Sequence, residues 1–314
     1  MSTTDGLLQE GTFAHYALFY RGPGEYARQV CAFVREGLSV GEPVLVAVPG
    51  RRLDLVRRAL GAAAAAVSFA DMAVLGRNPA RIIPAIRRFT DSRRPHRTRF
   101  VGEPVWAGRS AAEIAEATRH EALINAALAA VPATVLCPYD ASALAAAVLD
   151  GARRTHPRIA GDGAWRASTD YTGTAVAHAT AAQPLPSPPA AAWSTAFGAP
   201  DLPALREHLR RRAAQEGLGS SRAEDLMIAV HEIAANTVVH GGGTGTLAIW
   251  WDGTALVCEI RDGGHITDPL AGRHPDSPHD DSGHGLRLAH ELCDLVEIRS
   301  GHQGTTVRLH MLIS

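Results

Sequence analysis

The chain has 314 residues and a formal net charge of −1, from 31 basic and 32 acidic side chains. This length predicts about two domains, and the balanced charge offers no electrostatic case for a nucleic-acid or membrane partner. No apolar stretch reaches the roughly 18 residues that span a bilayer, and the first residues lack signal-peptide features, so we expect a cytoplasmic protein.

The chain has 4 cysteines, and no two of them form a C-x-x-C pair. Cys31, Cys137, Cys258 and Cys293 are scattered through apolar contexts. Such spacing favours buried free thiols over disulfides or zinc ligands. The cysteines therefore indicate neither a redox nor a metal role.

Apolar runs alternate with helical patterns in the first half of the chain. Strands are predicted at 13–20, 43–48, 67–72, 98–105 and 134–138, and helices follow them at 25–38, 53–60, 80–90, 111–128 and 142–154. Successive β-α units favour a doubly wound, mostly parallel sheet. Ligands of such sheets gather at the carboxyl ends of the strands, where this sequence places Tyr20, Arg21, Pro49, Gly50, residues 103–109, Tyr139 and Asp140.

No phosphate-binding glycine loop follows these strands, so nucleotide binding in this half is unsupported. Residues 11–157 instead resemble the MEDS domain, the methanogen/methylotroph DcmR sensory domain. The likeness is carried by His15 in the first strand and by the runs 33–38, 41–43, 102–106 with Arg109, 121–125 and 136–140. It implies a RecA-like sheet without a P-loop, which senses small, often hydrocarbon-like molecules.

A small-molecule pocket in this domain would need an aromatic wall and a few polar anchors. They could be supplied by His15 at a strand start, Trp106 and Arg109 after the end of one strand, and Tyr139 after the end of another. A tryptophan in the position of Trp106 is more often a core residue, and a Tyr-Asp pair such as Tyr139-Asp140 more often forms a turn that caps a helix. Glu121 and its neighbour His120 fall in the middle of a predicted helix, where we expect a structural or exposed position.

Residues 158–194 are rich in Ala, Pro, Thr and Ser, and we expect a linker there. Proline stiffens such a segment into extended conformations and prevents regular sheet ladders. Within this region, residues 165–171 could pack back on the first domain. A short strand at 193–197 could open the second domain, which we place at 195–314.

A helix predicted at 221–240 carries Glu232, Asn236 and His240 at intervals of four residues, off its apolar stripe. Side chains at this spacing stay within one quadrant of a helix and can face one ligand together. A carboxylate can orient a hydroxyl group, and an amide oxygen suits Mg²⁺ in a phosphate site. By itself, the pattern equally describes an ordinary amphipathic helix.

The rest of this half predicts a small α/β sandwich. Strands at 247–251 and 255–260 flank the turn pair Asp252-Gly253, and two more follow at 294–299 and 305–312. Helices at 203–216, 221–240 and 284–292 would pack on one face of this sheet.

Three further motifs follow the helix, at 261–264, 282–286 and 304–306. In this order, the motifs make residues 195–314 resemble the GHKL ATPases, the Bergerat-fold superfamily. The resemblance implies that the domain binds ATP and Mg²⁺. It makes Glu232 the base that orients a hydroxyl or water, Asn236 the Mg²⁺ ligand and Asp262 the acceptor for the adenine amino group. The other nucleotide-binding positions that it implies are His240, Gly264, Gly283, Gly285 and Thr305.

The segment between Gly264 and Gly283 is polar, punctuated by proline and without periodicity, and it resembles an ATP lid. One position departs from the family pattern Asp-x-Gly-x-Gly. Ile266 stands where the second glycine is expected. The adenine contact should survive this change, whereas the resemblance no longer supports lid hinging and turnover.

The layout of the second domain indicates its branch within the superfamily. The helix at 203–216 runs almost directly into the next one, which leaves no room for the dimerisation hairpin of a histidine kinase. This resembles the anti-sigma-factor branch, which implies binding of a sigma factor, phosphorylation of Ser or Thr on a STAS-type anti-anti-sigma partner, and a possible homodimer. Two alternatives stay open: an ATP-binding module that sequesters its partner without kinase activity, and a sensor histidine kinase that uses His208.

Overall fold

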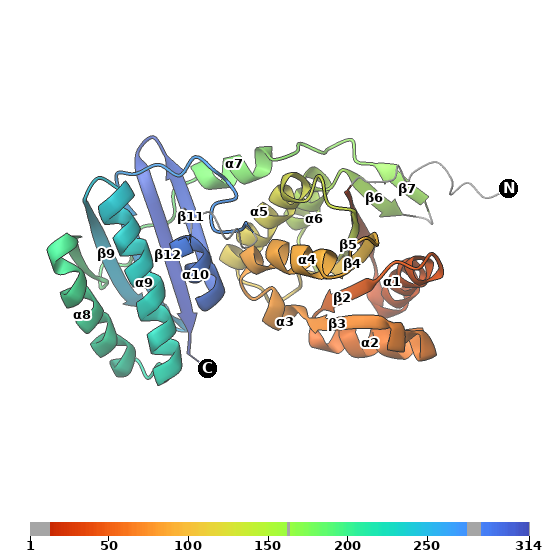
Figure 1. Cartoon of the computed structure of the whole chain (residues 1–314), viewed down its shortest axis with the longest axis horizontal. Helices are drawn as coiled ribbons and strands as arrows, with labels where there is room; N and C mark the ends of the chain where they lie inside the picture. The colour runs from red at the N-terminus through yellow and green to blue at the C-terminus, as the bar shows by residue number, and fades with distance from the viewer. Residues whose placement is uncertain (1–12, 162–163, 275–283, 314) are drawn as a thin grey trace. The chain divides into compact units, whose positions relative to one another are not determined.

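A computed structural model describes residues 13–161, 164–274 and 284–313 (Figure 1). The chain divides into two compact units, one ending at Ala177 and the other beginning at His178. Within the described ranges, no helix is both long and apolar enough to cross a membrane.

The first unit is built on a seven-stranded sheet with the order β3-β2-β4-β5-β1-β6-β7. Its strands are β1 (Ala14–Tyr20), β2 (Val44–Val48), β3 (Val67–Asp71), β4 (Thr98–Gly102), β5 (Ala133–Asp140), β6 (Arg158–Gly161) and β7 (Ala164–Ala167). Every pairing is parallel except that of β6 with β7. The predicted mostly parallel sheet is therefore confirmed.

Helices cover both faces of this sheet, as expected for a doubly wound fold. They are α1 (Gly22–Ser39), α2 (Gly50–Leu60), α3 (Met72–Leu75), α4 (Ile82–Asp91), α5 (Ala111–Ala127) and α6 (Ala146–Thr155), with short 3-10 turns at Gly61–Ala66 and Pro79–Arg81. Helices α1 and α2 share one apolar core with the sheet, whereas α5 contacts α4 and α6. A capping box between Ser110 and Glu113 starts α5, where the two residues satisfy each other's backbone N–H groups.

Strands β6 and β7 occupy residues that the composition assigned to a linker. Strand β6 pairs with β1, and Trp165 in β7 packs its ring 4.4 Å from that of Tyr16. The spacer is accordingly shorter than the sequence suggested, because the strands join the sheet as an edge hairpin. The chain continues through α7 (Ala175–Ala182) to β8 (Trp193–Gly198), the strand expected to open the second domain.

The second unit holds a five-stranded antiparallel sheet with the order β11-β12-β10-β9-β8. Its remaining strands are β9 (Thr244–Trp251), β10 (Ala255–Asp262), β11 (Leu295–Gly301) and β12 (Gly304–Leu312). After a 3-10 turn at Ala199–Asp201 come the helices α8 (Leu202–Gln215) and α9 (Ser220–His240), and α10 (His284–Leu292) follows later in the chain. All three helices lie on one face of the sheet and share its apolar core, which confirms the predicted α/β sandwich (Figure 1).

Candidate functional site

Helix α9 brings Glu232 and Asn236 against the start of α10. A Cβ atom added to Gly285 would lie 2.9 Å from Asn236 Nδ2 and 3.1 Å from Glu232 Oε2. The first turn of α10 therefore lies close to both polar side chains, and a larger residue at position 285 would require them to move. Within the described part of the chain, neither the Glu232 carboxylate nor the Asn236 amide is engaged in a hydrogen bond, and both side chains are half-buried.

The carboxylate of Asp262 closes strand β10 and is fixed from two directions. The Thr237 hydroxyl donates a hydrogen bond to Asp262 Oδ2 at 2.7 Å, and the Gly264 N–H donates to Oδ1 at 2.8 Å. Because an ionised carboxylate has about four acceptor positions, it retains capacity for a donor from outside the protein. Thr237 directly follows Asn236, so one turn of α9 positions both the amide and the carboxylate.

Glycine backbones surround Asp262. A Cβ atom on Gly264 would lie 2.9 Å from the His240 carbonyl oxygen, and one on Gly241 would lie 2.6 Å from Asp262 Cγ. Gly304 has a φ of +111° and its missing side chain would strike the Asp262 carbonyl oxygen. These three contacts leave no room for larger residues, so glycine is required for the strand ends to meet here.

A relay of hydrogen bonds holds the segment after Asp262 in place. The Ile266 N–H donates to Ser300 Oγ at 2.8 Å, Ser300 Oγ lies 2.7 Å from Thr305 Oγ1, and the Thr305 hydroxyl donates to the Gly264 carbonyl at 2.9 Å. The Ile266 side chain also packs against the domain core. The residue that replaces the family's second glycine therefore anchors this segment.

The structure describes some of the remaining positions that the resemblance implied for nucleotide binding, and others lie outside the described residues. His240 ends α9 with an exposed side chain. Gly283 lies outside the described residues, as does most of the second half of the expected lid. In the first half, Gly272 has a φ of +73° and lies against Leu286 and His290 of α10. This part of the segment consequently packs on the domain.

Sequence reasoning missed two contributors to this site. Thr237 and Ser300 supply hydroxyl groups that orient Asp262 and Thr305. The position of Thr237, within the same helical motif and one residue after Asn236, was the available signal. Ser300 carried none, because its role depends on the pairing of β11 with β12.

In the first unit, the carboxyl ends of β1, β4 and β5 meet as predicted. Glu103 is buried and accepts hydrogen bonds from the hydroxyls of Tyr20 at 3.3 Å and Tyr26 at 3.4 Å. Arg52 contacts Glu103 and pairs with Asp140 Oδ2 at 3.3 Å. Burial raises the pKa of Glu103 well above its usual value, and the charge of Asp140 adds to this effect.

The four residues suggested for a sensor pocket fall into two pairs. The Arg109 guanidinium lies 4.1 Å from the Trp106 ring centroid and donates to the Gly76 carbonyl, and burial lowers the pKa of Arg109 to about 10. His15 and Tyr139 both lie beside His156, at ring-centroid distances of 4.0 Å and 5.5 Å. A single pocket lined by all four thus stays a prediction.

Comparisons with known proteins agree with this two-part architecture. Residues 14–157 match the family model of the MEDS domain, the "MEthanogen/methylotroph, DcmR Sensory domain", and residues 198–311 match that of the "Histidine kinase-like ATPase domain". No curated protein matches the chain. Among solved structures, the crystal structure of the RsbU and RsbW domains of Rv1364c from Mycobacterium tuberculosis aligns with 22% identity and a TM-score of 0.29. That alignment covers 38% of this chain and 32% of the solved one. The chain therefore joins a MEDS sensory domain to a histidine kinase-like ATPase domain.

Proposed function

We propose that this protein is a signalling regulator whose MEDS domain controls an anti-sigma-factor-type domain that binds Mg²⁺ and ATP. In this proposal the second domain sequesters a sigma factor, phosphorylates Ser or Thr on a STAS-type anti-anti-sigma partner, or does both. The observation that carries the proposal is the convergence at one turn of α9. Glu232 and Asn236 lie beside Gly285, and Thr237 holds Asp262.

The residues present fit an adenine nucleotide. Asp262 can accept a hydrogen bond from an exocyclic amino group, and guanine offers a carbonyl acceptor at the same position, which a carboxylate repels. Gly264 and Gly241 carry no side chain that would hinder a base approaching Asp262. This combination supports a preference for ATP over GTP.

Phosphoryl transfer assigns separate tasks to the two polar residues of α9. The Asn236 amide oxygen would hold Mg²⁺, which neutralises charge on the phosphates when bound. The Glu232 carboxylate would orient the hydroxyl of a partner Ser or Thr and accept its proton as that oxygen attacks the γ-phosphorus, while the bond to the β,γ-bridging oxygen breaks and ADP leaves. Both groups remain free of hydrogen bonds within the described chain, which suits such roles.

The surroundings of His208 argue against a histidine kinase. Its ring stacks on Trp193 with centroids 3.6 Å apart and planes inclined by 16°. Its Nε2 atom is shielded from solvent and has no hydrogen-bond partner in the described chain. Burial and the neighbouring Arg211 and Arg212 lower the pKa of His208. A phosphoacceptor has to reach the γ-phosphate, whereas this ring is held against β8.

Sequestration without phosphoryl transfer is the second candidate, and Ile266 favours it. Its backbone is tied to Ser300 and its side chain packs on the core, where the family pattern has a flexible glycine. A lid anchored at its base can retain nucleotide without completing turnover. ATP binding is common to both candidates.

Incubation of the full chain with radiolabelled Mg-ATP and a purified STAS-type anti-anti-sigma protein separates these functions. A kinase of the proposed type transfers acid-stable label to a Ser or Thr of the partner. Bound ATP without transfer would establish sequestration. Acid-labile label on the chain itself, lost in the His208→Ala variant, would contradict both and establish a histidine kinase.

A further inference from the structure

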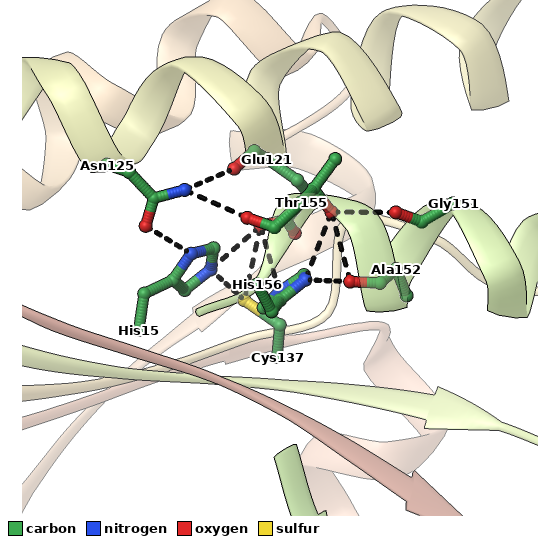
Figure 2. Close-up of polar contacts among 8 residues, drawn as sticks. All are labelled: His15, Glu121, Asn125, Cys137, Gly151, Ala152, Thr155 and His156. Carbon is green, nitrogen blue, oxygen red and sulfur yellow. Dashed lines mark hydrogen bonds and ion pairs between the residues drawn. The ribbon is translucent and has the colours of Figure 1, made fainter. Parts of the chain in front are cut away.

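Four buried side chains with metal-ligating atoms meet inside the first domain. His15 lies in β1, Glu121 in α5, Cys137 in β5 and His156 directly after α6 (Figure 2). Each is at most 2% exposed, and their ligand atoms all lie within 4.8 Å of one another. Neither the helical pattern that ends at residue 154 nor the spacing of the cysteines had indicated this cluster.

The hydrogen bonds around His15 turn its Nε2 atom toward the cluster. Asn125 Nδ2 donates to the Glu121 carbonyl at 3.1 Å and to the Thr155 carbonyl at 2.9 Å, which fixes the orientation of the amide (Figure 2). Its Oδ1 atom must then accept from His15 Nδ1, 3.1 Å away. The neutral His15 ring therefore carries its proton on Nδ1 and presents the Nε2 lone pair to Glu121 and Cys137.

His156 is held in the same tautomer by the backbone. Its Nδ1 atom lies 2.8 Å from the Ala152 carbonyl oxygen, which can only accept a hydrogen bond. Its Nε2 atom is buried, has no hydrogen-bond donor within the described chain and lies 3.3 Å from Glu121 Oε2. Histidines that bind metals typically donate their other N–H group to a carbonyl or amide oxygen in this way.

Several distances within the cluster are close to the edges of a tetrahedral metal site, although the four ligand atoms spread over up to 4.8 Å. His15 Nε2 lies 2.9 Å from Glu121 Oε2 and 3.3 Å from Cys137 Sγ, and Cys137 Sγ lies 3.5 Å from Glu121 Oε2. Ligand bonds of roughly 2.0–2.3 Å, as zinc makes to nitrogen, oxygen and sulfur, give tetrahedral edges of about 3.3–3.8 Å. One ion could thus contact all four atoms after small side-chain adjustments.

Charge gives a second reason to place a cation here. Two neutral imidazole lone pairs and a carboxylate oxygen face one another, which is unfavourable in a buried site unless a positive charge lies between them. A divalent ion balances one carboxylate and one thiolate, leaving the cluster neutral. The competing explanation is an imidazolium of His15 or His156 paired with Glu121, with Cys137 as a thiol.

We propose that His15, Glu121, Cys137 and His156 bind one divalent first-row transition-metal ion, with zinc as the best match to this ligand set. Imidazole and thiolate ligands select such metals over Mg²⁺ or Ca²⁺. Because the protein supplies all four ligands and buries them, the site has no open position for a substrate. The ion would tie two strands and two helices of the sensory domain together, so that metal binding and domain stability are coupled.

Cobalt substitution in the full-length protein tests the site directly. The chain is stripped of metal with EDTA under reducing conditions and titrated with Co²⁺, whose thiolate complexes have a near-ultraviolet charge-transfer band and whose tetrahedral complexes absorb strongly in the visible. We expect both absorption bands to reach saturation at about one ion per chain. Added zinc should displace the cobalt and remove both bands. If the protein of native sequence shows neither band, or if its cobalt titration does not saturate at about one ion per chain, the proposal is overturned.

Two cysteine variants test whether Cys137 is a ligand. Cys137→Ser should abolish the charge-transfer band, whereas Cys31→Ser, which alters another buried thiol of the same domain, should retain it. A band that survives in Cys137→Ser contradicts the assignment. If Cys137→Ser fails to fold, thermal unfolding of the native chain decides: zinc should raise the unfolding temperature of the stripped protein by several degrees, whereas an ion pair of His and Glu predicts no change.

Discussion

The two domains build their polar sites in opposite ways. The ATPase-type site draws on short motifs in which the relevant residues are close in sequence, such as Glu232, Asn236 and Thr237 on one helix. The cluster in the sensory domain draws His15, Glu121, Cys137 and His156 from four separate elements. The first site is half-buried and leaves polar groups free for a ligand, whereas the second is closed.

This difference follows from what each site would bind. Phosphates and a nucleotide base are approached by backbone atoms, which requires glycines at strand ends and helix starts, and these leave local patterns in the sequence. A metal ion needs only one atom from each ligand, and a parallel sheet can bring such atoms together across long crossovers. The predictions below test whether the two sites differ in function as they do in construction.

The largest expected effect is at Glu232. Glu232→Gln keeps the size of the side chain but removes the base, so we expect phosphoryl transfer to fall by about 10²- to 10⁴-fold with ATP binding retained. Glu224→Gln, an exposed substitution on the same helix, is the matched control. Transfer at the native rate in Glu232→Gln would remove the proposed catalytic role.

Removal of the Asp262 carboxylate should change base recognition. A hydrogen bond to a charged group contributes about 1.5–3 kcal/mol, so Asp262→Ala should weaken ATP binding by roughly ten- to hundredfold. GTP, which gains nothing from this carboxylate, should be bound about as weakly by both proteins. Equilibrium binding of fluorescent ATP and GTP analogues measures the difference, and an equal loss for both nucleotides would indicate general damage instead.

In the sensory domain, Asn125 supports His15 without contacting the proposed ion. Asn125→Ala removes the acceptor for His15 Nδ1, and the loss of such a supporting contact typically weakens metal affinity about 10- to 100-fold. Competition with a zinc-binding dye measures this change. Because the Asn125 amide also bonds two backbone carbonyls, unfolding of the metal-free variant is the necessary control. Unchanged zinc affinity would speak against the assigned His15 tautomer.

The smallest expected effect is at Thr237. Thr237→Val preserves the shape of the side chain but removes the donor to Asp262, a contribution of about 1 kcal/mol or roughly fivefold in ATP affinity. Thr246→Val, on the exposed side of β9, provides a matched control. A loss as large as that of Asp262→Ala would mean that Thr237 itself contacts the nucleotide.

Much of the fold could be predicted because hydrophobic periodicity reports local structure. The five β-α pairs were identified, and the meeting of Tyr20, Glu103 and Asp140 followed from the common edge of parallel strands. The β6–β7 hairpin was assigned to a linker because its short strands are embedded in a region dominated by small residues and proline. The amino-acid composition describes the average character of a segment, whereas the pairing of a short strand such as β6 depends on the strand beside it in the sheet.

The candidate sites were predicted unequally for the same reason. Gly285 lies beside Glu232 and Asn236, and Thr237 of the same helix holds Asp262, while the roles that the motifs imply for these residues stay predictions. Glu121 was expected to be structural or exposed, and the structure rules out only the exposed position: it is buried between two histidines, because the side of α5 that faces the sheet is set by tertiary packing. Cys137 had no sequence neighbour to mark it, and its partners are at least 16 positions away.

Calorimetric titration with Mg-ATP tests the central claim most directly. The native protein is compared with Asn236→Ala, which removes the proposed Mg²⁺ ligand, and with Glu224→Ala as a control on the same helix. We expect saturable binding by the native and control proteins and strongly weakened binding by Asn236→Ala. Equal binding by all three proteins, or no binding by the native chain, would contradict the assignment of this domain's nucleotide site.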